Sequence, residues 1–289
     1  MNKIIKLLIT SIIFLETLMA IDLAIQYPHI EKQIEVREYN FNNKNRVNIF
    51  ISMGQSNALG IFTKQIFENK KNIYMPIENI HTFPKKISFI NFNPYNHNKA
   101  TPYYSFINTA TKFADIYNLN KPLIIVNISR GGKGFDTMHS VNNDWNMNEN
   151  FYNSLFPQSI HYLKVLFNQL QKDGYEPYVI GIDWNQWEAE KSNKSIDDYY
   201  IQYSEFFNKI SDVIPNKDFN LFMCNPTSNF FEHKDKVSEA FHKILNERKN
   251  AYIYYPDKLV DNIFKDEVKV HYNEFVHQKI AEFILNKIK

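Results

Sequence analysis

The sequence of 289 residues contains a single cysteine, Cys224. One cysteine cannot form an internal disulfide or supply the cysteine cluster of a structural metal site. The chain also lacks an excess of one charge, because 33 basic residues stand against 31 acidic ones. The basic residues are scattered, whereas nucleic-acid binding usually requires a clustered basic surface. We therefore expect no disulfide, no cysteine metal site and no nucleic-acid partner.

Long apolar runs are absent after the first twenty residues, so no later stretch is long enough to span a bilayer. Residues 1–20 have a short basic start and an apolar run that ends at Ala20. This layout is typical of a secretory signal peptide, although Glu16 interrupts it. An uncleaved anchor or a buried helix is the alternative. We expect a leader segment at 21–45, no stable membrane insertion after cleavage, and a periplasmic or secreted bacterial protein.

Short apolar runs alternate with amphipathic segments in the rest of the chain, and 44% of all residues are hydrophobic. Strands are predicted at 46–53, 122–129, 178–184, 219–224 and 251–255. Helices are predicted at 103–118, 153–172, 196–213, 235–248 and 273–288. This alternation indicates a three-layer α/β/α sandwich with a mainly parallel five-stranded sheet, formed by residues 46–289. Residues 61–100 look like a long insertion of loops and short strands.

The first segment that carries chemistry is Gly54-Gln55-Ser56-Asn57, directly after the first strand. A serine at a strand-to-helix turn can project its hydroxyl over the sheet edge, where the helix N–H groups stabilise negative charge. Ala58 stands where the G-x-S-x-G elbow of ordinary α/β-hydrolases has its last glycine. The alternative is that Ser56 only caps the next helix.

The second segment is a glycine loop that follows the buried strand at 122–129. Three of the seven glycines in the chain lie between Gly131 and Gly134. A phosphate-binding P-loop needs Lys followed by Ser or Thr, but Gly134 follows Lys133. A backbone donor for an oxyanion at Gly132 is the better interpretation, and an ordinary glycine turn is the alternative.

The third segment, 183–190, clusters amide, carboxylate and indole groups at a strand end. Gln186 can donate a hydrogen bond to an oxyanion, and Glu188 can orient a histidine. Trp184 and Trp187 can stack on a sugar face. The alternative is that these residues form a rim, with the tryptophans in the core.

His271 is the candidate base, because it directly precedes the last predicted helix and follows the acidic residues Asp266 and Glu267. A neutral imidazole near pH 7 is a suitable general base. His277 is expected to face solvent or to pack, and His139 is a distant second candidate.

The order of these segments resembles the SGNH hydrolase superfamily, and within it the sialate O-acetylesterases and the acetylxylan-esterase-like carbohydrate esterases. The resemblance covers roughly residues 46–288. It implies a serine nucleophile at Ser56 and a histidine base at His271. It also implies an oxyanion hole formed by the Ser56 backbone, the Gly132 backbone and the Gln186 side chain.

Two positions depart from the pattern of these esterases. Trp187 replaces the usual glycine between the glutamine and the glutamate, and Val268 stands where an aspartate often precedes the histidine. The acid that orients the base must then come from elsewhere. Glu188 is the first choice and Asp266 or Glu267 the second, while a dyad without an acid is also open.

The sequence thus predicts a serine esterase that removes O-acetyl groups from a carbohydrate through an acyl-enzyme. Sialic acid, peptidoglycan and other polysaccharides are candidate substrates, with Asn57, Trp184 and Trp187 as substrate-binding residues. The expected mechanism needs no metal and no organic cofactor. One alternative is a catalytically inactive SGNH-fold carbohydrate-binding protein, and a second is a phosphate- or nucleotide-binding protein that uses the glycine loop.

Overall fold

The computed structural model shows the chain as two compact units, Met1–Glu38 and Tyr39–Lys289. The described residues all lie in the second unit and are 46–59, 73–76, 84–91, 122–129, 134–135, 145–147, 154–187, 193–227, 231–261, 264 and 271–288. The expected signal peptide and leader lie outside them. Within these ranges no helix is both long enough and apolar enough to cross a membrane.

A seven-stranded sheet forms the centre of the described part of the second unit, with the strand order β3-β2-β4-β1-β5-β6-β7. All neighbouring strands are parallel except β2 and β3, which pair antiparallel. The strands are β1 (Arg46–Gly54), β2 (Ile73–Pro76), β3 (Phe89–Asn91), β4 (Leu123–Ser129), β5 (Glu176–Asn185), β6 (Asn220–Cys224) and β7 (Ala251–Tyr254). The parallel sheet is the one that the sequence predicted.

The sheet is larger than the five strands predicted from the sequence. All five are present as β1, β4, β5, β6 and β7. The two additional strands, β2 and β3, come from the insertion at 61–100 and extend one edge of the sheet. They are only four and three residues long, too short for a clear alternation of apolar and polar positions.

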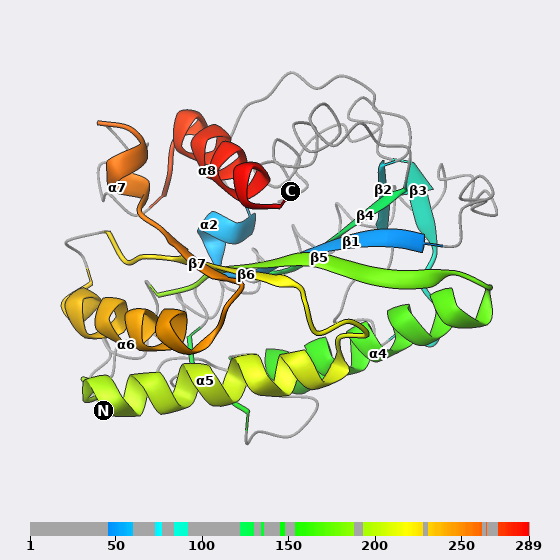
Figure 1. Ribbon diagram of the computed structural model, residues 1–289, viewed down its shortest axis with the longest axis horizontal. Helices are drawn as coiled ribbons and strands as arrows, with labels where there is room; N and C mark the ends of the chain where they lie inside the picture. The colour runs from blue at the N-terminus through cyan, green and yellow to red at the C-terminus, as the bar shows by residue number, and fades with distance from the viewer. Residues whose placement is uncertain are drawn as a thin grey trace, which may run out of the picture. The chain divides into compact units, whose positions relative to one another are not determined.

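Helices cover both faces of the sheet, which gives the predicted three layers (Figure 1). α4, α5 and α6 lie on one face, and α2 and α8 lie on the other. The helices are α2 (Ser56–Leu59), α4 (Leu155–Lys172), α5 (Ile196–Val213), α6 (Lys234–Glu247), α7 (Pro256–Leu259) and α8 (Glu274–Lys287). Four of the five predicted helices are thus observed, and the fifth, at 103–118, lies outside the described residues.

The central strands are buried because helices pack on both sides of them. Residues Val47–Met53 of β1 are all buried, and so are Leu123–Val126 of β4. Parallel strands that are covered on both faces require such continuous apolar runs, since each face contributes to the core. The apolar stretches in the sequence therefore determine which strands lie in the middle of the sheet.

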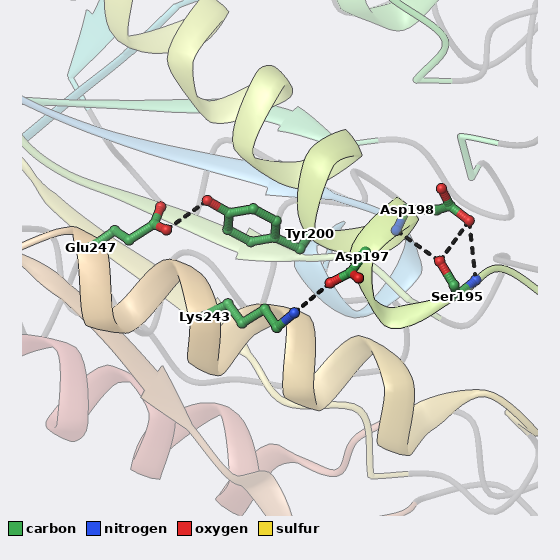
Figure 2. Close-up of polar contacts among 6 residues, drawn as sticks. All are labelled: Ser195, Asp197, Asp198, Tyr200, Lys243 and Glu247. Carbon is green, nitrogen blue, oxygen red and sulfur yellow. Dashed lines mark hydrogen bonds and ion pairs between the residues drawn. The ribbon is translucent and has the colours of Figure 1, made fainter.

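The long helix α5 begins at a capping box, shown in Figure 2. The Ser195 Oγ accepts the Asp198 N–H at 3.1 Å, and the Asp198 carboxylate accepts the Ser195 N–H at 3.4 Å. Such a cap contributes about 1 kcal/mol. An exposed ion pair between Lys243 and Asp197 joins α6 to α5 (Figure 2) and adds little stability, because water screens it.

Candidate active site

The strand register brings three of the predicted segments together at one edge of the sheet. Gly54, the last residue of β1, pairs with Ser129 at the end of β4 and with Asn185 at the end of β5. Ser129 leads into the glycine loop, and Asn185 precedes Gln186. Ligands of open parallel sheets bind outside this carboxyl edge, so the register places the strand ends that precede these segments where a ligand would bind.

A tight turn at Gly54 carries the chain from β1 into α2. Gly54 has a φ of +138°, and a Cβ placed on it would lie 2.0 Å from the carbonyl oxygen of Asn185. The next residue, Gln55, donates its N–H to that same oxygen at 3.1 Å. Only glycine permits this close approach. The helix α2 then begins at Ser56.

Two buried amides connect the serine segment to the end of β5. The Nε2 of Gln186 donates to the Oε1 of Gln55 at 3.2 Å, and the two side chains are 0% and 2% exposed. The Oε1 of Gln186 has no hydrogen-bond partner among the described residues. Since an amide nitrogen carries two hydrogens, this contact uses one of the donors of Gln186. The contact places the Gln186 amide beside the turn that leads to Ser56.

A long-range hydrogen bond attaches the C-terminal segment to the serine segment. The backbone N–H of Tyr272 donates to the Oδ1 of Asn57 at 2.9 Å, across 215 positions of sequence. Asn57 follows Ser56, and Tyr272 follows the half-buried His271. In Figure 1, α2 and α8 accordingly lie on the same face of the sheet. The backbones that carry the predicted nucleophile and base are therefore one residue away from a shared contact.

Several predicted site residues lie outside the described residues. These are Gly132, Glu188, Asp266, Glu267 and the second-choice base His139. Their predicted roles stay predictions. Among the residues that the structure describes, no group of three or more His, Cys, Asp or Glu side chains is placed to hold a metal ion.

The two tryptophans of the third segment lie in the core. Trp184 and Trp187 are both 0% exposed. The Trp184 ring packs on Phe206 and Trp145, with centroid distances of 4.5 and 5.1 Å, and the Trp187 ring lies 6.1 Å from that of Phe231. Neither ring offers a face to a sugar. The prediction that these tryptophans stack on a sugar is therefore replaced by its alternative, in which they pack in the core.

His277, on α8, packs rather than facing solvent. It is 5% exposed, and its ring lies 5.8 Å from that of Tyr272. Burial lowers the pKa of the His277 imidazole to about 3, because the charged form loses its hydration. A histidine that is buried and this weakly basic is unsuited to general base catalysis at neutral pH. His271 therefore stays the candidate for the base.

A buried polar cluster lies next to the site, and the sequence analysis predicted no role for its members. The Tyr254 hydroxyl donates to the Asp183 carboxyl at 3.0 Å, and the Tyr272 hydroxyl lies 3.3 Å from the Cys224 sulfur. Burial raises the pKa of the Asp183 carboxyl to about 7, although the bond from Tyr254 opposes this shift. The sequence offered one sign of this cluster, because Asp183 is an acidic residue within the apolar stretch 178–184.

Replacing Asp183 with asparagine is expected to stabilise the protein at alkaline pH. The native carboxyl keeps its proton up to a pKa of about 7, whereas an ordinary aspartate loses it near 3.8. The native state therefore binds more protons than the unfolded chain in this window, and the free energy of unfolding falls as the pH rises through it. Asparagine keeps an acceptor for Tyr254 and cannot ionise.

Urea unfolding at pH 5 and pH 8 measures this effect. The stability difference between Asp183→Asn and wild type should grow by on the order of 2–3 kcal/mol between these pH values. Titration of His277 is common to both proteins and cancels in the difference. A difference that is the same at both pH values would mean that Asp183 is already ionised in the native protein at pH 5.

Comparisons with known proteins find similar folds among solved structures. No protein-family model and no curated protein matches the sequence. Among solved structures, a protein of Arabidopsis thaliana has a TM-score of 0.55 at 15% identity, and the match covers 84% of this chain and 98% of that protein. NanS has a TM-score of 0.56 at 14% identity with the same two coverages.

A carbohydrate acetylesterase from Xanthomonas citri has a TM-score of 0.52 at 12% identity. The match covers 83% of this chain but 55% of that protein, so the chain spans about half the length of the Xanthomonas enzyme. At such identities the likeness concerns the fold. The chain shares the α/β/α fold of these solved structures, one of which is a carbohydrate acetylesterase, and the fold expected from the sequence is confirmed.

Proposed function

We propose that this protein is a serine esterase that removes O-acetyl groups from a carbohydrate, with Ser56 as nucleophile and His271 as base. The observation that carries the proposal is the hydrogen bond from the Tyr272 N–H to the Asn57 Oδ1. It ties the residues that follow the nucleophile and the base to each other across the whole domain. The likeness in fold to a carbohydrate acetylesterase supports the reaction class.

The proposed reaction is an acyl transfer in two steps. His271 takes the proton of the Ser56 hydroxyl as its oxygen attacks the acetyl carbonyl carbon. The tetrahedral intermediate collapses, and the sugar hydroxyl leaves with the proton from His271. Water, deprotonated by His271, then attacks the acetyl carbon of the acyl-enzyme. The bond from this carbon to the Ser56 oxygen breaks, acetate leaves, and His271 returns the proton to the Ser56 oxygen. Glu188 is proposed to orient His271, with Asp266 or Glu267 as the second choice.

The oxyanion of the intermediate requires donors that are fixed before the reaction. We assign this role to the backbone N–H groups of Ser56 and Gly132 and to the side-chain amide of Gln186. The place of Gln186 supports the assignment, because it directly follows β5, whose last residue pairs with Gly54 in the turn that leads to Ser56, and a donor held in place before the reaction stabilises developing charge strongly. Each such donor contributes about 3–4 kcal/mol to lowering the barrier.

The burial of Trp187 bears on the alternative of an inactive sugar-binding protein. That alternative rests partly on a bulky ring in place of the glycine of related esterases. The ring is fully buried against Phe231, so its bulk is accommodated in the core. The proposed esterase therefore does not require a glycine at this position.

The substrate is proposed to be an O-acetylated glycan outside the cytoplasm, and the location rests on the layout of residues 1–20. Purified protein should release acetate from a small acetyl ester and from at least one of O-acetylated sialic acid, peptidoglycan or polysaccharide. Mass spectrometry of the released acetate and of the deacetylated glycan measures both products. Release of acetate from none of these compounds would reject the esterase and favour the inactive binding protein.

A further inference from the structure

We propose that Asn57 is a positioning residue, which holds the segment carrying His271 in place relative to Ser56. The inference rests on the proposed esterase function and gives Asn57 a role other than the substrate contact that the sequence suggested. Asn57 is 2% exposed, and its Oδ1 accepts the Tyr272 N–H. An oxygen that is buried and already occupied by the protein is poorly placed to select a sugar.

Tyr272 is an anchor for this segment, held by its side chain as well as by its backbone. It is 0% exposed, and its hydroxyl lies 3.3 Å from the sulfur of Cys224 at the end of β6. Its ring lies 6.2 Å from that of Phe264, with which it forms an isolated antiparallel bridge. The side chain is therefore attached to the sheet, while the backbone N–H is attached to α2 through Asn57.

The bond to Asn57 consequently connects the backbone beside His271 to the start of α2. A general base must come within hydrogen-bond reach of the proton that it takes. A displacement of about 1 Å in such a group can lower the rate about 100-fold. Loss of the Asn57 acceptor also leaves a buried N–H at Tyr272 unsatisfied, which favours movement of this segment.

Asn216 offers a matched control in the same protein. Its Oδ1 accepts the Val179 N–H at 2.8 Å, and its Nδ2 donates to the Val179 carbonyl at 2.9 Å. This is also a long-range bond between an amide side chain and the backbone. It lies toward the amino end of β5, whereas the candidate site lies at the carboxyl end. Its loss should reduce stability without displacing His271.

The test compares Asn57→Leu, Asn57→Asp and Asn216→Leu in the full-length protein, at a temperature where all are folded. The readouts are kcat and KM on a small acetyl ester and the rate at which a fluorophosphonate labels Ser56. Asn57→Leu should lower kcat and the labelling rate about 10- to 100-fold, with KM nearly unchanged. Asn57→Asp keeps an acceptor oxygen and should recover most of both rates, and Asn216→Leu should keep both.

The outcomes separate this inference from the proposed function. Wild-type rates in Asn57→Leu would overturn the positioning role, and so would an equal loss of kcat in Asn216→Leu. If the wild type hydrolyses no acetyl ester but is labelled at Ser56, the substrate class fails and the labelling rates of the variants still decide the role of Asn57. A wild type that is neither active nor labelled would overturn both.

Discussion

Acetyl-ester turnover is expected to fall by about 10⁴- to 10⁶-fold in Ser56→Ala protein. The proposed mechanism forms its acyl-enzyme on the Ser56 hydroxyl, and alanine offers no oxygen for that bond. The remaining donors can still bind the ester and polarise its carbonyl, so a small residual rate is expected. Steady-state kinetics of the purified variant measure the loss.

The fold of Ser56→Ala protein should be unchanged, because alanine is readily accepted at the first residue of α2. Thermal unfolding followed by circular dichroism provides the control. Near-normal turnover in a folded variant would mean that another group attacks the ester, and the assignment of the nucleophile would have to be abandoned.

Replacing Gly54 with alanine is expected to destabilise the protein and to disrupt the site at the same time. The added Cβ would lie 2.0 Å from the Asn185 carbonyl oxygen. The backbone at position 54 also has a φ of +138°, which residues with a side chain rarely adopt. The end of β1 or the end of β5 must then move. We expect a loss of at least about 3 kcal/mol, or a fall in Tm of about 6–12 °C, with little esterase activity left in the folded fraction.

Gly174 is the matched control for this substitution. It also has a positive φ, +83°, but a Cβ placed on it would meet no atom within 4 Å. Gly174→Ala should therefore cost only the backbone strain, about 1–2 kcal/mol, and should keep full activity. Equal losses in the two variants, or an active Gly54→Ala protein, would show that the contact with Asn185 does not shape the site.

The fold could be predicted from the sequence where local chemistry and packing agree. Helix α5 occupies the predicted range, Ile196–Val213, because Ser195 caps its start and Pro215 follows its last turn. The central strand β4 was found because both of its faces are buried and its sequence is almost entirely apolar. The edge strands β2 and β3 were not placed, since strands this short lack a usable pattern.

The site was predictable in its order along the chain but not in its side-chain environment. Strand ends and glycines indicated Gly54 and Gln186, and the register then brought the ends of β1 and β5 together. The face of the sheet on which the Trp184 side chain lies could not be predicted from the sequence, because a buried strand is apolar on both faces. The bond between Asn57 and Tyr272 joins residues far apart in sequence, and no local pattern reports it.

The most direct test of the central claim is to identify the residue that a fluorophosphonate labels, by peptide mass spectrometry, in wild-type and His271→Ala protein. The claim is that a hydroxyl near the start of the domain is activated by an imidazole near its end. We predict one modified peptide in the wild type, with the label on Ser56, and almost none in the variant. Label on a different serine, or undiminished label in His271→Ala, would contradict the claim.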